Sequence, residues 1–533
     1  MARRPATSEI VQHTAIDVVN NAVRSNTVTE QDLVSIRDSY MGYIQQAYGT
    51  KQAAAAQDSV NILNKFVEGL TCLFTKLYAT KWTTFFDDLL AMTILNPSPN
   101  SDQDTITGTK FYLKVVNSIH DEIADILMAK SVADQQRDTV LKDLVRTRDV
   151  TKITTAWQSI LTQLNGQHPI IVELCLAGVG KWASWIDLGL IVTEPFLNLF
   201  FGYVMAGLSD PNQEAAKLRD SSLLAYTEIL SKKMRPADKL SLIEVLKVGE
   251  LVAGLTNSTP LQAMRFTSTY DTDFVEIVAK LVNATVLDIV IILTDATGDD
   301  DALRARADQH LKTFIPYTLR FFSDEYDEVC SIMIPCVTEL LTYFRKRAAG
   351  NPVYKLMLPS VLQAIMNKMK YDETCEWGQD DHQTDEAEFQ ELRKRLQNLQ
   401  QAVAMVDETL YIQTISEMVG TCFESFRVNR NEVHWRDLDL ALHEMFLFGQ
   451  LAMKNGNIYS KTKPISPAAE TLIVMMFKLV DTGERFRLIY SFTLTLIQTS
   501  RAHHILQYIF SSWRYVSGIR HSLNTILRLS PTF

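Results

Sequence analysis

The sequence predicts an all-α protein built from a long series of packed helices. Its 533 residues are 47% hydrophobic but include only 20 glycines and 15 prolines, so the chain has apolar material for a long core and few residues that break helices. Apolar residues recur with helical spacing, and breaks interrupt this pattern roughly every fifteen to twenty-five residues. The alternation of apolar and polar residues that indicates strands is almost absent. We therefore expect helices throughout.

Helix signals can be followed along most of the chain. After Pro236, which suits the first position of a helix, Asp238 lies in the positively polarised first turn, and apolar residues from Leu242 to Ala253 follow helical spacing. We expect this stripe to be the buried face of one surface helix. Similar patterns predict helices over about 8–24, 29–48, 58–78, 83–95, 104–129, 215–232, 273–293, 301–322, 325–347 and 353–370.

The spacing of these helices predicts the architecture. Taken in pairs, they give units of roughly 40 to 47 residues, which is the period of HEAT-type repeats. Such units stack into a solenoid in which each pair contacts mainly its neighbours. Because similarity between the units is weak, the spacing of the helices alone supports this prediction. The expected fold is therefore a HEAT-repeat-type α-solenoid, a superhelical stack of antiparallel helix pairs.

Charge and cysteine usage argue against several classes of protein. A net charge of −10 is unfavourable for non-specific binding to nucleic acid or to an anionic membrane, because such binding needs clustered Lys and Arg. The six cysteines are scattered without a CxxC motif, so neither a disulfide framework nor a zinc site is predicted. Charged residues interrupt the most apolar windows, 188–208 and 281–294, which we expect to form buried helices rather than to insert into a membrane.

Several enzyme motifs are nearly present, but each lacks a required residue. In the run that ends at Lys181 and resembles a phosphate-binding loop, Trp182 replaces the magnesium-binding Ser or Thr. The pair His443–Glu444 begins a zinc-protease pattern, but Leu447 replaces the second histidine, so we expect the pair on a helix surface. We therefore expect a protein that is not an enzyme and has no cofactor, metal site or catalytic residue.

An acidic segment divides the chain. Residues 371–388 contain no Lys or Arg but eight carboxylates, namely Asp372, Glu373, Glu376, Asp380, Asp381, Asp385, Glu386 and Glu388. Such a segment is expected to face solvent or a basic partner. The expected organisation is helical repeats over 1–370, an acidic insertion loop over 371–388, further helices over 389–483, and an atypical tail rich in Arg, Ser and Leu over 484–533.

Four stretches carry a resemblance to a known family, namely Lys81–Leu89, Trp185–Leu188, Lys368–Glu373 and Asp385–Leu399, of which the last two are the most specific. They resemble the exportin-T family of importin-β-like nuclear transport receptors, in a form that looks fungal. The resemblance covers roughly residues 8–481. Chains of this family are about twice as long and begin with a further repeat, so we expect the first part of their Ran-binding arch to be missing.

The tail is expected to lie outside the resemblance. We expect the resemblance to stop near Thr482–Gly483, because residues 485–533 contain six Arg but no Lys, Asp or Glu. This change of composition led to the hypothesis that the tail is a gene-model artefact. Detection of its peptides in the native protein by mass spectrometry would contradict that hypothesis.

The resemblance implies a transport receptor. Members of the family bind tRNA cooperatively with GTP-bound Ran, cross the nuclear pore by touching Phe-Gly nucleoporins, and release their cargo in the cytoplasm when GTP is hydrolysed. The implied protein is a monomer that shuttles between nucleus and cytoplasm and influences pre-tRNA splicing. Two alternatives stay open: an exportin for protein cargo, and a HEAT-repeat scaffold that binds proteins but no RNA.

The resemblance also suggests where the ligands would bind. A receptor of folded tRNA reads the phosphate backbone and shape with Lys and Arg. The candidates are two basic spots at helix ends, Lys232, Lys233 and Arg235 in the first and Arg345, Lys346 and Arg347 in the second. Those cations could instead only complement helix dipoles. The candidates for Ran contact are Asp380, Asp381, Asp385, Glu386 and Glu388, unless the segment is a passive loop or pairs locally with Arg393, Lys394 and Arg395.

Overall fold

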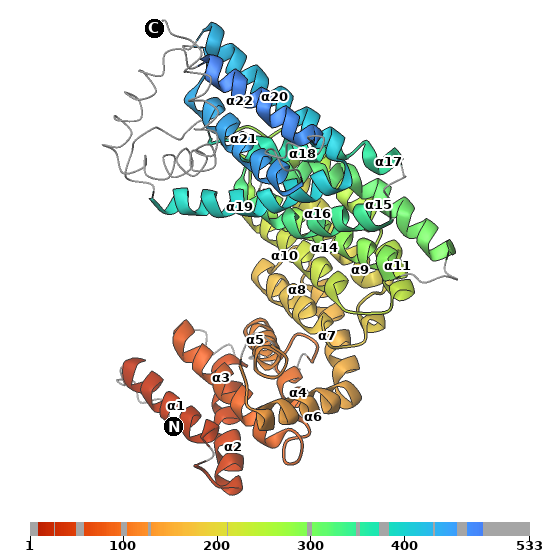
Figure 1. Cartoon of the computed structure of the whole chain (residues 1–533). Coiled ribbons are helices and arrows are strands. Elements are labelled where there is room, and N and C mark those ends of the chain that lie inside the picture. The colour runs from red at the N-terminus through yellow and green to blue at the C-terminus, as the bar shows by residue number, and fades with distance from the viewer. Residues whose placement is uncertain are drawn as a thin grey trace, which may run out of the picture. The chain divides into compact units, whose positions relative to one another are not determined.

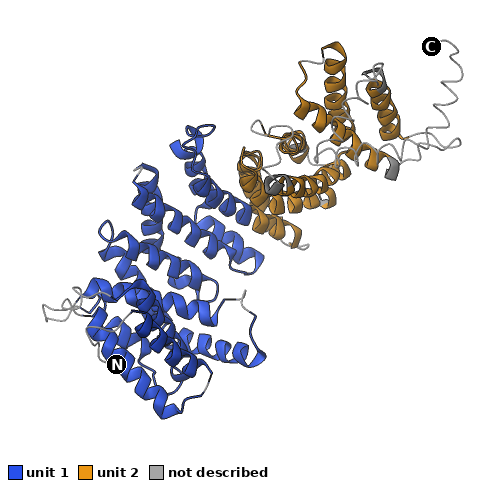
Figure 2. Cartoon of the chain, turned by 90° about the vertical axis from the view of Figure 1, so that its left-hand side faces the viewer, with its two compact units in different colours: residues 1–285 blue, residues 286–533 orange. Residues whose placement is uncertain are grey.

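The computed structural model describes residues 9–25, 27–49, 58–96, 104–125, 129–209, 212–295, 301–347, 352–372, 383–429, 432–455 and 466–482. Within these ranges the chain forms helices and turns and contains no strand, so the all-α prediction is confirmed (Figure 1). The chain divides into two compact units, residues 1–285 (unit 1) and residues 286–533 (unit 2), coloured separately in Figure 2.

The helices of unit 1 follow one another closely along the chain. They are α1 (Glu9–Arg24), α2 (Glu30–Tyr48), α3 (Val60–Leu77), α4 (Phe85–Leu90), α5 (Thr105–Ile123), α6 (Val132–Arg148), α7 (Val150–Gln163), α8 (Pro169–Ala183), the 3-10 helix η2 (Leu188–Leu190), α9 (Glu194–Ser209), α10 (Gln213–Ser231), α11 (Pro236–Val245), α12 (Val248–Thr256) and α13 (Thr259–Gln262). Helix α14 (Thr272–Asp295) spans the boundary between the units.

Five helices of unit 1 form one continuous row. Helix α1 packs on α3, α3 on α5, α5 on α8 and α8 on α10, and we call these five helices the main row. Helix α2 lies against α3, α7 against α8, and α9 against α10. Because α5 lies inside the row, consecutive side chains such as Tyr112 and Leu113 are fully buried, as expected for a helix covered on more than one side.

Unit 2 is built in the same manner. Its helices are α15 (Asp301–Phe322), α16 (Asp327–Arg347), α17 (Pro352–Lys355), α18 (Leu358–Lys368), α19 (Gln383–Val406), α20 (Glu408–Val428), α21 (Trp435–Asn455) and α22 (Pro467–Thr482). Helix α16 packs on α15 and α19, α19 on α18 and α20, and α20 on α21 and α22. Each helix therefore buries its apolar stripe mainly against helices that are near it in sequence, as in a repeat stack.

Aromatic residues of the first stretch that resembles exportin-T, and Trp182 just before the second, belong to the core. Trp82, Phe85 and Phe86 are buried, and Phe85 packs edge-on against Phe74 with ring centroids 5.0 Å apart. The Trp182 indole is fully buried and donates a hydrogen bond of 3.2 Å to the Val116 carbonyl. These side chains hold helices together and are not available to a ligand.

The glycines in the run that resembles a phosphate-binding loop lie inside a helix. Gly178 and Gly180 are buried in α8. A Cβ on Gly178 would lie 2.6 Å from Asn117 Oδ1 of α5, and a Cβ on Gly180 would lie 3.2 Å from the Ala225 Cα of α10. The two glycines therefore allow α8 to approach its neighbours in the main row.

Three expected helices differ from those observed. The helix expected over 353–370 is divided into α17 and α18. The helix expected from Pro236 to Ala253 is broken at Lys247, which has a left-handed φ of 50° and separates α11 from α12. This break buries Val248, whereas Val245, expected in the buried stripe, is 56% exposed. The helix expected over 83–95 is shorter and is confined to α4 (Phe85–Leu90), followed by turns. The spacing of apolar residues alone did not reveal where these helices end.

Helix α14 is the one helix among the described residues that is long and apolar enough to cross a membrane, by length and composition alone. In its most apolar window, 56% of the helix is buried. The buried positions recur in pairs, as at Phe274–Val275 and Val278–Ala279, whereas Glu276 and Lys280 form an ion pair of 3.1 Å. This pattern is that of a helix packed on one side, as expected for the window 281–294.

Alanine substitutions at two glycines of α9 test how closely helices pack in unit 1. A Cβ on Gly207 would lie 2.6 Å from the Ala215 carbonyl oxygen of α10, whereas a Cβ on Gly202 meets nothing within 4 Å. We expect Gly207→Ala to lower the free energy of unfolding by about 1–3 kcal/mol because backbone must move. Gly202→Ala should raise it by up to about 1 kcal/mol. Urea denaturation measures both, and equal effects would contradict the packing argument.

Candidate functional site

The first predicted basic spot lies where α10 ends and α11 begins. The Lys232 ammonium is half-buried and donates to the Ile186 carbonyl. Lys233 is exposed, and Arg235 is an exposed residue whose Nε lies 2.8 Å from Asp238 Oδ2. An ion pair this exposed contributes little to stability and can exchange for another anion. Lys232 therefore fixes the junction, whereas Lys233 and Arg235 are accessible to a ligand.

A further cation joins this spot from a distant part of the sequence. The Arg146 Nε of α6 donates a hydrogen bond of 2.9 Å to the Trp185 carbonyl, next to the Ile186 carbonyl that accepts from Lys232. Burial lowers the pKa of Lys232, and the positive charge of Arg146 lowers it further. We call Arg146, Lys232, Lys233 and Arg235 the basic junction. Sequence reasoning missed Arg146 because only tertiary packing brings α6 to this loop.

Carboxylates accompany the basic junction. Asp143 pairs with Arg146 at 2.5 Å, Asp238 pairs with Arg235, and Asp187 favours the charged form of Lys232 and so opposes the fall of its pKa. The junction therefore has only a small excess of positive charge. Such a surface can make a few defined contacts with phosphates but is poorly suited to non-specific binding, which needs many free cations.

The second predicted basic spot lies at the end of α16 in unit 2. Arg345 is exposed, and its Nη1 lies 3.2 Å from the Met405 sulfur. Lys346 is exposed as well, whereas the side chain of Arg347 lies outside the described residues. Neither Arg345 nor Lys346 forms an ion pair within the described part of the chain, so both are available to an anionic ligand.

The acidic segment is described only at its ends. Asp380 and Asp381 lie outside the described residues, as do the side chains of Asp385 and Glu386, whereas Glu388 is exposed on α19. Because α19 begins at Gln383, the last part of the expected loop 371–388 is helical.

Within the described part of the chain, Arg393 forms no ion pair with the acidic segment, although local pairing with it was one of the alternatives. Its guanidinium is buried and donates to the Met369 carbonyl at 2.8 Å and to Asp439 Oδ2 at 2.7 Å. It also lies 4.7 Å from the ring centroids of both Tyr371 and Phe389. Arg393 therefore fastens α19 to the end of α18 and to α21.

The next two cations differ in their surroundings. The exposed Lys394 pairs with Glu391 of its own helix at 3.2 Å. Arg395 donates a hydrogen bond of 3.1 Å to the Ser331 carbonyl of α16. Arg395 therefore connects two helices of unit 2, whereas Lys394 remains at the surface.

The pair His443–Glu444 is buried, so the expectation that it lies on a helix surface is wrong. Glu444 is fully buried and accepts a hydrogen bond from the Gln400 amide of α19. The other Glu444 oxygen, Oε1, and the Gln400 carbonyl oxygen have no partner among the described residues. Burial raises the pKa of Glu444 to about 7 and lowers that of His443 to about 3, because desolvation disfavours the charged form of each group.

The described residues offer no group of three or more His, Cys, Asp and Glu side chains placed to hold a metal ion. The buried cysteines Cys175 and Cys336 have pKa values raised by desolvation, which disfavours the thiolate.

Comparison with a solved structure gives the class of fold. A structure titled "Importin13 cytosolic state" matches 88% of this chain and 51% of its own chain with a TM-score of 0.59, at 11% sequence identity. The chain therefore has the HEAT-type solenoid fold of an importin, as predicted.

The family follows from sequence. The family model described as Exportin-T matches residues 301–528, and the model described as Exportin 1-like protein matches residues 59–221. A protein named Exportin-T from Neosartorya fischeri is 47% identical over 98% of this chain and 49% of its own length, and one from Aspergillus clavatus is 48% identical over 99% and 50%. The chain belongs to the exportin-T family and spans about half the length of the curated relatives it matches.

The match extends further than expected at the C-terminal end. The Exportin-T model reaches residue 528, and a protein named Exportin-T from Aspergillus niger aligns with 100% of this chain. The expectation that the resemblance stops near Thr482–Gly483 is therefore wrong. The hypothesis that residues 484–533 are a gene-model artefact stays a hypothesis, because it was drawn from their composition.

The buried Glu444 predicts a pH dependence of stability. Its folded pKa of about 7 lies above the ordinary value of 4.5, so its contribution is fully present below pH 4.5 and is lost as the pH rises to 7. The free energy of unfolding should fall by roughly 3 kcal/mol over this window. Glu444→Gln should remove this fall, because glutamine is neutral at every pH.

The urea concentration at the midpoint of unfolding of unit 2 is measured at pH 5 and at pH 8, for the wild-type chain and for Glu444→Gln. Glu391→Gln is the control, since Glu391 is an exposed carboxylate of α19. A pH dependence that is the same in wild type and Glu444→Gln would show that other groups cause it.

Proposed function

We propose that this chain is part of a nuclear export receptor that binds tRNA cooperatively with Ran in its GTP form. The observation that carries the proposal is 47% identity to proteins named Exportin-T over 98% of the chain. Identity at this level over nearly every helix supports a common use of the fold as well as a common fold. The importin-like solenoid is consistent with transport, because it offers long surfaces to large ligands.

Cooperative binding of two large ligands fits a helix stack. Each helix is held mainly by its neighbours, so small adjustments between neighbours can add up along a solenoid. If tRNA and Ran each stabilise the same arrangement, each ligand increases the affinity for the other by the same factor. Hydrolysis of GTP on Ran would remove one ligand and so release the other in the cytoplasm.

The charged residues suggest which parts of the chain meet each ligand. Lys233, Arg235, Arg345 and Lys346 are exposed cations that can meet phosphates, and the overall charge of −10 would discourage other RNA. Glu388 and the acidic residues before it are proposed to contact a basic surface of Ran. The chain itself would act without catalysis, as a monomer without membrane insertion, and would pass between nucleus and cytoplasm by touching Phe-Gly nucleoporins. An influence on pre-tRNA splicing would follow from its control of tRNA export.

A titration of labelled tRNA tests the proposal. The chain is mixed with Ran carrying either a non-hydrolysable GTP analogue or GDP, and tRNA binding is followed by fluorescence anisotropy. We expect tight binding only with the GTP analogue. The double charge reversal Lys233→Glu with Arg235→Glu should weaken binding by about tenfold and reduce the dependence on salt, because phosphate contacts are lost.

Lys394→Glu is the control for this titration, since Lys394 is an exposed lysine outside both basic spots. Equal tRNA affinity with either form of Ran would contradict the proposed coupling. Binding of GTP-bound Ran without any tRNA binding would instead indicate an exportin for protein cargo.

A further inference from the structure

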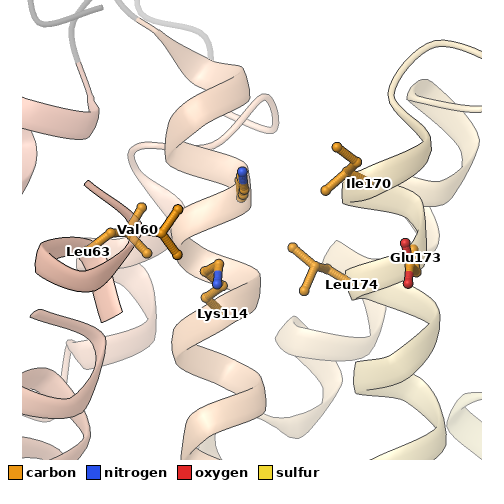
Figure 3. A pocket seen from close by; sticks show the side chains of 7 residues that line it. Val60, Leu63, Lys114, Ile170, Glu173 and Leu174 are labelled. Atoms are coloured by element: carbon orange, nitrogen blue, oxygen red, sulfur yellow. The ribbon is translucent and has the colours of Figure 1, made fainter. Parts of the chain in front are cut away.

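A groove crosses three helices of the main row of unit 1. It is lined by Val60 and Leu63 of α3, Lys110 and Lys114 of α5, and Ile170, Glu173 and Leu174 of α8, is open to solvent, and has a volume of about 300 Å³ (Figure 3). Val60 is 67% exposed and Ile170 is 60% exposed. The groove therefore has open apolar rims on α3 and α8 with two lysines between them.

The lysines of this groove differ from two other lysines of the main row, Lys65 and Lys181. Lys65 pairs with Asp17 at 2.5 Å, and Lys181 pairs with Asp121 at 2.7 Å, so each neutralises a carboxylate of a neighbouring helix. Within the described part of the chain, Lys110 forms no ion pair, and Lys114 only donates a hydrogen bond of 3.2 Å to the Asn64 side chain.

Electrostatics favours an anion at this place. Partial burial lowers the pKa of Lys114, and repulsion by the charge of Lys110 lowers it further. Glu173 is the one carboxylate that lines the groove, and it lies on the α8 side (Figure 3). Two lysines against one glutamate leave a positive groove on a chain whose net charge is −10. A carboxylate or phosphate of a ligand would relieve the repulsion between the lysines.

The apolar rims distinguish a protein ligand from a nucleic acid. Val60, Leu63, Ile170 and Leu174 are aliphatic, so they provide no flat ring on which a base could stack. Aliphatic side chains of a peptide, by contrast, would bury the exposed surface of Val60 and Ile170. A volume of about 300 Å³ lies at the lower end of the range for ligand sites, which suits a few side chains of a segment.

We propose that the groove between α3, α5 and α8 is a docking site for an acidic protein segment that also carries aliphatic side chains. The acidic groups of the segment contact Lys110 and Lys114, and its aliphatic groups pack between Val60 and Ile170. This site is separate from the proposed binding of tRNA and does not depend on it. It gives unit 1 a protein partner recognised by charge and apolar contact together.

Selection from a random library of 12-residue peptides displayed on phage tests the proposal. The library is selected on the 533-residue chain after removal of phage that bind the variant Lys110→Glu with Lys114→Glu. We expect enriched peptides that combine two or more acidic residues with two or more aliphatic residues. Enrichment of basic or neutral peptides, or no enrichment, would overturn the proposal.

The most enriched peptide, labelled with fluorescein, is then titrated against single variants. Lys114→Glu should weaken binding by about tenfold or more, and Glu173→Gln should strengthen it, because the first reverses an attraction and the second removes a repulsion. Lys217→Glu, which changes an exposed lysine of α10 in the same unit, should have no effect. Equal weakening by Lys114→Glu and Lys217→Glu would mean that only net charge matters and would overturn the docking site.

The proposed apolar contacts are tested separately, with a control variant of their own. Ile170→Ser should weaken peptide binding severalfold, whereas Val245→Ser, at a similarly exposed aliphatic residue of α11, should not. Circular dichroism checks that each variant keeps its helices. A 12-nucleotide single-stranded RNA serves as competitor, and displacement of the peptide by RNA at equal concentration would reassign the groove to nucleic acid.

Discussion

The structure depends on helices that can bury their apolar stripes only against other helices. In unit 1 the main row places α3, α5 and α8 between neighbours on both sides, so each of them loses surface to two partners. Fully buried side chains such as Phe74, Tyr112 and Trp182 fill the spaces between them. Because the hydrophobic effect grows with the apolar area removed from water, no single helix of this row would be stable alone.

Close packing also determines where polar groups lie. Gly178 and Gly180 let α8 approach α5 and α10, and Lys181 at the end of the same helix reaches Asp121 of α5. Most cations between helices are neutralised in this way by carboxylates nearby. Lys110 forms no such pair within the described part of the chain and lines the groove beside Lys114, so its charge is available to a ligand there.

In unit 2, buried polar contacts also hold neighbouring helices together. Arg393 connects α18, α19 and α21 through the Met369 carbonyl and Asp439, and the two rings that flank it shield these bonds from water. Two helical turns further along α19, Gln400 meets Glu444. A charged group at such a place is costly unless it is paired. Arg393 accordingly has an ion-pair partner in Asp439, and burial raises the pKa of Glu444. Both contacts fix α21 against α19.

The sequence by itself determined the all-α class, most helices and the repeat architecture, because helical periodicity and end signals act within a few residues. It also indicated the family through short motifs, in the first of which Trp82, Phe85 and Phe86 proved to be core. Only the tertiary structure decided that Lys247 breaks a helix, that Glu444 is buried, and that Arg146 joins Lys232. These features depend on contacts between residues far apart in the chain, and no local pattern records which helix face meets which neighbour.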